Sequence, residues 1–435
     1  NKATLDPFYQ RANEVLGLPD YGDFQADKWQ QVMLGHKPGF LFGDEVIEPE
    51  VALYGKTSIK MAIAYGKALQ EAPNITCCIH ANVTEIEPET SLTAVRRLQV
   101  STLQGNSFHV ESKVYILACG GWENARLLLV SQRHTPAGLG NAHDLVGRYY
   151  MEHPKIYSGK IVPQSTLLRS PICLDLKRIQ RGFVELGIRL SDSQQRKERI
   201  LNHYVELLPD FPEGFPAALQ AFLWFGSRVK RFKLHEAQAK DVALFAPHLL
   251  NITNYLLRRR FNRSMPFPAI KILNHFEQAP NRESRITLSR DRDALGLNRL
   301  QVDLRITDQD RQSMVRLQQV LKDHFQRHQV GQFQMEIFDA HHGWETLTDS
   351  SHHMGTTRMD DNPRQGVVDR NCKVHGLENL YISSSSVFPT VGHANPTLTI
   401  LALTLRLCDH LKAEAIPHLS KPAQISNPSA TVYAS

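Results

Sequence analysis

The sequence predicts an α/β (α+β) fold in which a Rossmann-like region is joined to an antiparallel sheet. Residues 113–132 show the pattern of a buried strand, a double-glycine turn and a helix, which is typical of doubly wound parallel sheets. Apolar and polar residues alternate over 155–161, 182–190 and 269–276, which favours half-buried antiparallel strands. Apolar residues recur nearly all round the predicted helix from Leu398 to Leu411, so we expect this helix to be buried.

The composition indicates a folded protein with more than one domain. The 435 residues are 42% hydrophobic and 22% charged, and a chain of this length exceeds one ordinary core. The 50 basic and 44 acidic residues give a formal charge of +6, which is too mild to indicate nucleic-acid binding. No apolar run is long enough to span a bilayer. The six cysteines include no C-x-x-C pair, so we expect neither a disulfide framework nor zinc cysteines.

Local patterns predict the order of the remaining elements. Before the glycine turn we expect a helix over 5–16, an irregular stretch over 18–55, a helix over 57–72, a strand over 75–86 and a meander over 97–103 and 107–111. Beyond the antiparallel strands, residues 308–328 have the spacing of an amphipathic helix. The first residue is Asn1 rather than methionine, so the compartment is left unassigned.

The chemistry-bearing residues gather at the two ends of residues 351–411. His352 and His353 stand at one end, and His393 and Asn395 stand at the other. Histidine is the side chain best suited to accept a proton near neutral pH. Asn395 is a suitable N-cap, and Pro396 suits the first helical position. The positive end of the helix dipole then favours a negative charge near the start of the helix. Asn395 acts either as a cap alone or as a cap and a site residue.

This stretch resembles the C-terminal signature of the glucose-methanol-choline (GMC) oxidoreductases, flavoenzymes that oxidise alcohols with FAD. The matching segments are H-x-x-G-T at 352–356, Arg358-Met359, GVVD at 366–369, NLYIS at 379–383, SVFPT at 386–390 and ANPTLTI at 394–400. The resemblance implies that His352 is the catalytic histidine and that Asn395 is its partner on the face of the flavin. It also implies that the helix at Pro396 points at the pyrimidine end of the flavin ring.

The resemblance extends to the glycine turn and implies a set of FAD contacts. The turn reads ACGGWENARLLL at 118–129, and a further match, M-x-H-P, ends at Pro154. The residues expected to bind FAD are Val83, Cys119, Gly120, Gly121, Asn124, Ser384, Ser385, Asn395, Pro396 and Thr397. Ser384 departs from many relatives, which carry an acidic or small residue there. His153 is expected to be structural, because a histidine beside a proline in a turn is usually a satisfied side chain.

The family's domain order implies the organisation of the chain. We expect an FAD-binding domain over 1–154, a substrate-binding domain over 155–340, a segment over 341–415 that carries the active site back to the FAD domain, and a disordered tail over 416–435. No G-x-G-x-x-G occurs in the sequence, so the Rossmann-like domain is expected to be incomplete, with its opening βαβ unit missing. The chain is therefore expected to be truncated at its N-terminus and, when isolated, inactive.

Two other function classes compete with an FAD-dependent oxidation of a small alcohol or sugar. A degenerate, flavin-free binding subunit would explain the missing glycine motif. A metal enzyme would use His341, His342, His352, His353 and His393, although these residues lack the usual ligand spacing. The basic helices within 211–267 favour a solvated face, with an anionic membrane surface or a partner subunit as the alternative. The sequence does not name the substrate or the electron acceptor.

Overall fold

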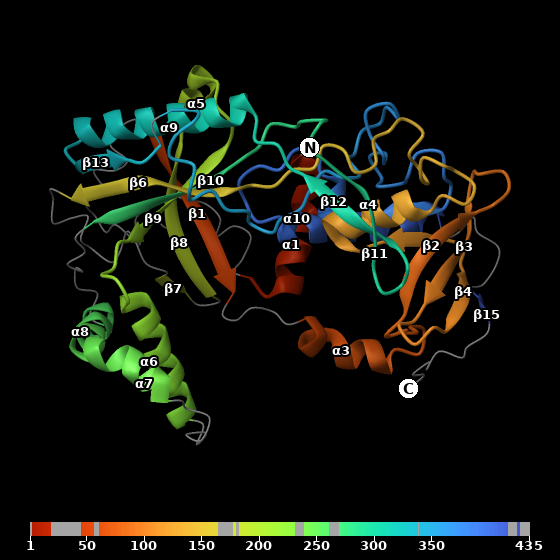
Figure 1. The fold of residues 1–435 in the computed structure, drawn as a ribbon, viewed down its shortest axis with the longest axis horizontal. Coiled ribbons are helices and arrows are strands. Elements are labelled where there is room, and N and C mark those ends of the chain that lie inside the picture. The colour runs from red at the N-terminus through yellow and green to blue at the C-terminus, as the bar shows by residue number, and fades with distance from the viewer. Residues whose placement is uncertain are drawn as a thin grey trace.

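The fold combines helices with separate sheets, which confirms the predicted mixed class (Figure 1). The computed structural model describes residues 2–18, 45–55, 61–163, 177–179, 182–230, 239–260, 269–337, 339–415 and 424–426. A large antiparallel sheet lies at one end of the molecule, and a smaller sheet region lies at the other end.

The large sheet forms from the predicted alternating strands. Its order is β1 (Ile47–Gly55), β8 (Gly182–Leu190), β9 (His203–Pro209), β10 (Ile270–Phe276), β6 (Lys155–Pro163) and β13 (Gly331–Met335), with β7 (Lys177–Ile179) also beside β8. The prediction of an irregular stretch over 18–55 is wrong for β1, which pairs with β8 along its whole length. Pro49 is tolerated in β1 because the strand borders only β8 on the sheet path.

The two faces of this sheet differ in character. Helix α9 (Asp308–Arg327) covers one face, and α5 (Asp192–Glu198) lies close by (Figure 1). The core beneath α9 contains Ile188 and Val205 from the sheet and Leu317 from the helix. Because strand side chains alternate between faces, the residues between these apolar positions point to the opposite side. That opposite face is rich in carboxylates, tyrosines and histidines, and it belongs to the candidate site.

The smaller region contains a parallel pair and a meander. Strand β5 (Tyr115–Leu117) pairs with β14 (Leu380–Ile382), and α4 (Gly120–Val130) follows β5 directly. The meander consists of β2 (Asn82–Pro88), β3 (Val95–Ser101), β4 (Ser107–Glu111) and β15 (Gln424–Ser426). A separate hairpin, β11 (Arg285–Arg292) and β12 (Asn298–Asp303), contacts α4.

Two predictions fail in the meander. The predicted strand over 75–86 begins only at Asn82, since Ile75 and Ile79 are exposed and have no partner strand to cover them. The predicted disordered tail contributes β15, which pairs with β4. The rest of that tail, 416–423 and 427–435, lies outside the described residues.

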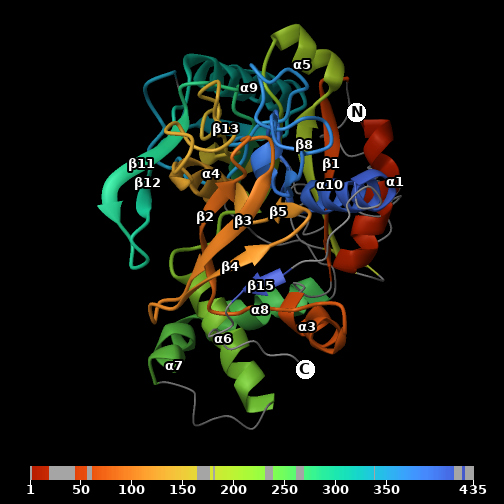
Figure 2. The ribbon, with the colours of Figure 1, turned by 90° about the vertical axis from the view of Figure 1, so that its right-hand side faces the viewer.

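Helix α10 (Thr397–His410) lies beside α1 (Lys2–Leu16) in both views of the ribbon (Figures 1 and 2). Tyr9 and Thr399 are joined by a hydroxyl hydrogen bond of 3.0 Å. Arg11 pairs with Asp409 at 2.6 Å. The prediction that α10 is buried all round is wrong, because only two of its residues, Ala402 and Leu407, are fully buried. The π-helical turn η8 (Leu411–Ala415) follows α10.

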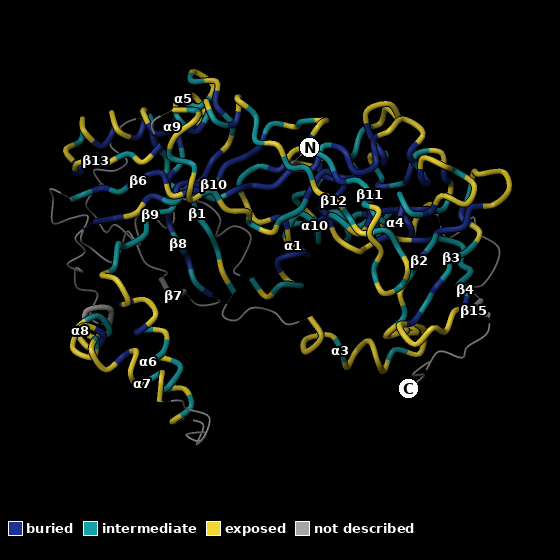
Figure 3. The backbone as a smooth tube through the Cα atoms, in the orientation of Figure 1, coloured by how far each residue is buried: buried dark blue, intermediate teal, exposed yellow. Residues whose placement is uncertain are grey.

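Several helices stand away from both sheets. They are α3 (Met61–Glu71), α6 (Phe215–Lys230), α7 (Ala239–Phe245), the 3₁₀ turn η6 (Ala246–His248) and α8 (Leu249–Arg260), and Figure 3 shows long exposed stretches on them. The last four form a unit around the buried rings of Phe215 and Phe245. Within the part of the chain that the structure describes, no helix is long and apolar enough to cross a membrane. Contact of this basic unit with a membrane or a partner stays a prediction.

Candidate active site

Two short segments bring four polar side chains together in pairs. An antiparallel bridge joins Met151 to Met354. The same register sets Glu152 opposite His353 and His153 opposite His352. His352 Nδ1 lies 2.7 Å from His153 Nε2, and His353 Nε2 lies 3.2 Å from Glu152 Oε1.

The pair of His153 and His352 has a defined protonation pattern. His153 is fully buried, and burial, with the nearby His352 and His275, lowers the pKa of His153 to about 3. Burial also lowers the pKa of His352, and Lys155 adds to this effect. Both rings are therefore neutral near pH 7. One ring nitrogen of the contact carries the hydrogen and the other accepts it. If His352 donates from Nδ1, its Nε2 keeps a free lone pair that can take a proton.

His353 is fixed by packing rather than aimed at open space. Its ring stacks on Trp122 with centroids 3.7 Å apart. Burial lowers the pKa of His353, although the neighbouring Glu152 opposes this effect. Gly121 is buried against the same loop, and a side chain there would overlap the carbonyl group of His353. Thr356 donates its hydroxyl hydrogen to the carbonyl oxygen of Gly121. The glycine turn thus holds the histidine loop in place.

A buried hydrogen-bond network joins the ends of β5 and β14. The amide oxygen of Asn124 accepts from the backbone N–H of Cys119 at 2.9 Å, and its amide nitrogen donates to Ser386 Oγ at 3.2 Å. Ser385 donates its hydroxyl hydrogen to the carbonyl oxygen of His353 at 2.7 Å. Ser384 accepts from the backbone N–H of Ser386 at 3.1 Å. The side chains of Asn124, Ser384 and Ser385, predicted to bind FAD, are thus engaged with the protein.

The exposed part of the glycine turn offers backbone atoms to a ligand. Ala118, Cys119 and Gly120 are exposed at the carboxyl end of β5. Gly120 has φ of +88° and open space around its Cβ position, so glycine both permits the turn and leaves room above it. Ligands of doubly wound sheets bind at such strand ends. Val83, the other predicted contact, is partly buried against the core of this region.

The start of α10 differs from the prediction for Asn395. Pro396 is the residue before the helix, and no side chain caps the first turn. Asn395 is exposed, and among the described residues none makes a hydrogen bond to its side chain. The N-cap assignment of Asn395 is therefore wrong. Thr397 and the following residues leave their N–H groups free at the positive end of the helix dipole, which suits a negative charge.

The polar face of the large sheet continues from the histidine pair. The rings of His153 and His275 are 6.3 Å apart, and those of His275 and Tyr204 are 5.5 Å apart. The ring of His393 stacks near Tyr204 at 6.2 Å, and its Nε2 lies 3.7 Å from Glu50. Sequence patterns missed these sheet residues, although the period-two alternation of β9 and β10 already set them on one face.

His341 and His342, the other histidines of the metal hypothesis, are exposed. His342 is exposed and contacts Asp339 at 2.8 Å. Within the described ranges, no three or more His, Cys, Asp or Glu side chains are arranged to hold a metal ion.

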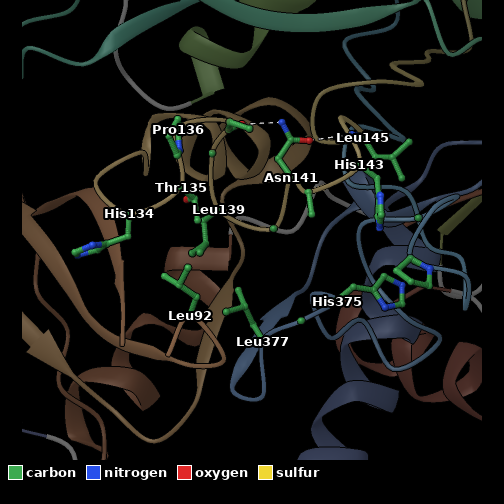
Figure 4. Close-up of a pocket in the computed structure, with 17 residues that line it drawn as sticks. Leu92, His134, Thr135, Pro136, Leu139, Asn141, His143, Leu145, His375 and Leu377 are labelled. Atoms are coloured by element: carbon green, nitrogen blue, oxygen red, sulfur yellow. Dashed lines mark hydrogen bonds between the residues drawn. The ribbon is translucent and has the colours of Figure 1, made fainter. Parts of the chain in front are cut away.

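A separate cavity of about 590 Å³ lies among loops of the smaller region (Figure 4). Its lining includes His134, His143 and His375. It shares no residue with the histidine pair or with the polar sheet face.

Comparisons with known proteins connect this geometry to a family. Residues 280–404 match the family described as GMC oxidoreductase. The chain is similar to 6'''-hydroxyparomomycin C oxidase of Streptomyces lividus, with 27% identity over 361 residues that cover 80% of this chain and 54% of that protein. It is also similar to the fructose dehydrogenase large subunit of Gluconobacter japonicus, with 25% identity over 305 residues, 70% of this chain and 48% of that protein. The chain spans about half the length of these curated relatives.

Among solved structures, pyridoxine 4-oxidase from Mesorbium loti resembles the chain with a TM-score of 0.49 and 18% identity. The superposition covers 94% of this chain and 69% of that one.

Proposed function

Residues 280–404 match the GMC oxidoreductase family, and the chain is similar to two curated oxidoreductases; from this premise we propose that it oxidises a CH–OH group of a small alcohol or sugar with FAD. The observation that carries the proposal is the contact of His352 with the neutral, buried His153 at the edge of a polar sheet face. A base of this kind accepts the hydroxyl proton of a substrate bound over that face.

His352 acts as the base through its Nε2 atom. For that atom to accept a proton, Nδ1 must carry the other hydrogen and donate it to Nε2 of His153. Because the pKa of His153 is lowered to about 3, His153 does not take the proton itself. It instead orients the ring and supports the positive charge that His352 gains. His153 is thus a positioning residue, and the proton stays on His352.

Bound FAD would supply the acceptor for the hydride of the carbinol carbon. The residues proposed to hold it are Cys119 and Gly120, through the exposed backbone at the end of β5, and Thr397, through the free N–H groups that begin α10. Asn395 is exposed at the same helix start and is proposed to donate a hydrogen bond to the substrate oxygen. The open space above Gly120 supports this assignment.

Anaerobic mixing of the flavin-loaded protein with a panel of alcohols and sugars tests the proposal. We expect bleaching of the oxidised-flavin absorbance with at least one substrate. His352→Ala should slow this bleaching about 10² to 10⁴-fold, the usual range for a lost general base. His342→Ala is the matched control, since His342 is exposed and lies outside the cluster. Purified protein without bound flavin would favour the binding-subunit alternative, and metal analysis of the same sample tests the metal alternative.

A further inference from the structure

We propose that Glu185 and Glu206 bind an ammonium group of the substrate, so that the substrate is an amino sugar or a similar amine-bearing alcohol. This inference rests on the proposed function, because it names the substrate class of the same site. It is carried by the placement of the two carboxyl groups, by the charges around them and by an unpartnered buried hydroxyl group next to them.

The two glutamates lie on neighbouring strands and on one face of the large sheet. The register of β8 and β9 places Glu206 opposite Gly187, and Glu185 is two residues from Gly187 on the same face. Tyr204 occupies the space above Gly187, where any side chain on Gly187 would overlap its ring. The missing side chain of Gly187 therefore leaves room for the ring of Tyr204 over this part of β8.

The carboxyl groups interact with each other and with neutral partners. Burial, together with the adjacent Glu206, raises the pKa of Glu185, and the two groups are close enough to share a hydrogen bond. Tyr54 donates its hydroxyl hydrogen to Glu185 at 2.8 Å, and His275 Nε2 lies 3.2 Å from Glu206. Burial lowers the pKa of His275 to about 4, so this ring is neutral and supplies no counter-charge. Two adjacent carboxyl groups disfavour ionisation of both, and a bound cation would relieve that repulsion.

Two cations on this face, Arg189 and Lys271, are paired with other carboxylates. Arg189, the nearest arginine along β8, is bound by three carboxylates, Glu48, Glu50 and Asp192. Lys271 pairs with Asp210 at 3.0 Å. Lys155 helps to lower the pKa of His153, His352 and His275. Among the residues that the structure describes, no lysine or arginine forms an ion pair with Glu185 or Glu206.

The hydroxyl group of Tyr204 is a second observation, independent of the carboxyl pair, that indicates a ligand. Tyr204 is only 8% exposed, and its hydroxyl oxygen has no hydrogen-bond partner in the described structure. Its hydroxyl oxygen lies over Gly187, the residue opposite Glu206 and two positions from Glu185, and both glutamates help to raise its pKa. Burying a hydroxyl group without a hydrogen-bond partner costs free energy unless a ligand supplies that partner. An ammonium group has three N–H donors, which match one oxygen from each glutamate and the oxygen of Tyr204.

The distance from the base sets the size of the substrate. The rings of His153 and His275 lie between His352 and the carboxyl pair, with successive centroids 4.6 and 6.3 Å apart. The amine and the reacting hydroxyl group must therefore sit at separated positions of one molecule. An amino sugar can carry the two groups on carbons that are not adjacent, whereas a two-carbon amino alcohol cannot.

Binding measured without turnover tests this inference separately from the proposed function. Calorimetry at pH 8 would compare glucosamine, galactosamine and mannosamine with their N-acetyl derivatives and with the parent neutral sugars, using the intact protein. We expect at least one amino sugar to bind about 10- to 100-fold more tightly than both neutral counterparts, as charge-assisted hydrogen bonds allow.

The double variant Glu185→Gln/Glu206→Gln should abolish this preference without lowering the melting temperature. Glu213→Gln, at an exposed glutamate outside the site, is the matched control and should retain it. The inference is overturned if no amino sugar is preferred, or if the preference survives in the double variant. If binding shows the preference but no flavin reduction follows, the proposed oxidation is wrong while the ammonium site stands.

Discussion

Nδ1 of His352 lies 2.7 Å from Nε2 of His153, a residue 199 positions earlier in the chain. The bridge between Met151 and Met354 sets this contact by backbone register. In the proposed mechanism, the neutral His153 takes the place that a carboxylate has in many acid–base pairs. It fixes the ring and the hydrogen without adding a buried charge.

Replacing His153 by phenylalanine should lower kcat strongly and leave KM nearly unchanged, because His352 loses its hydrogen-bond acceptor but the cavity stays filled. We expect a loss of about 10- to 100-fold, less than the loss of the base itself. His153→Gln keeps an acceptor and should recover part of the activity. An unchanged kcat in His153→Phe would show that His153 only fills space.

The pH profile of kcat/KM provides a second readout of this pair. The base must be neutral to accept a proton, and burial lowers the pKa of His352 from its ordinary 6.5. Activity in the wild type should therefore persist below pH 6.5 and fall only in more acidic solution. An acid limb centred above 6.5 would contradict the assigned environment of His352.

The two adjacent histidines should respond differently to removal. His352→Ala should reduce turnover by about 10² to 10⁴-fold at near-normal stability. His353→Ala should chiefly lower the melting temperature, because it removes the stack on Trp122 and the contact with Glu152. If His353→Ala abolishes turnover while His352→Ala is active, the base has been assigned to the wrong residue.

Sequence patterns predicted the elements whose signals are local. The strands β6, β8 and β10 and the helix α9 appear where alternation and helical spacing predicted them. Strand β1 was missed because its partner β8 lies more than 120 residues away and supplies the pairing. Propensity within one segment carries no record of such a partner.

The site was predicted only as far as its motifs reached. The catalytic role of His352 rests on the family resemblance and stays a prediction, whereas its contact with His153 could not be predicted because the two residues are distant in sequence. The cap prediction for Asn395 failed because Pro396 follows it as the last residue before the helix. Tyr204, Glu185 and Glu206 carry no motif, and only the register of β8 and β9 brings them together.

Gly121→Ala should destabilise the protein and disturb the histidine loop, since the new methyl group would overlap the carbonyl of His353. Overpacking of this kind costs about 1–3 kcal/mol. Gly226→Ala is the control, because Gly226 is also helical but has nothing near its Cβ position. That variant should gain about 0.5–1 kcal/mol. Denaturant titration of both would decide, and equal stabilities would refute the close contact.

Asn395→Ala should leave stability within about 0.5 kcal/mol of the wild type, because the exposed side chain makes no cap bond. Thr307→Ala is the reference, since Thr307 forms a capping box with Asp310 and should cost about 1 kcal/mol. Flavin reduction by substrate should still slow in Asn395→Ala. Equal destabilisation of the two variants would restore the capping role of Asn395.

Glu185→Gln tests the carboxyl pair through stability alone. Burial and Glu206 raise the pKa of Glu185 from 4.5 to about 7 in the folded protein. The folded state thus holds this proton more tightly than the unfolded state. The stability that this proton contributes to the folded protein is fully present below pH 4.5 and is lost as pH rises through about 7. Glutamine imitates the protonated carboxyl group and loses nothing over this range.

The melting temperature of Glu185→Gln should therefore equal that of the wild type near pH 4.5 and exceed it at pH 8.5. The upper bound of the gain is about 3 kcal/mol, from a shift of roughly two and a half pKa units. Glu213→Gln should show no such pH dependence, because Glu213 is exposed. A variant less stable than the wild type at pH 8.5 would mean that a cation of the protein already neutralises Glu185, which would also remove the reason for an ammonium ligand.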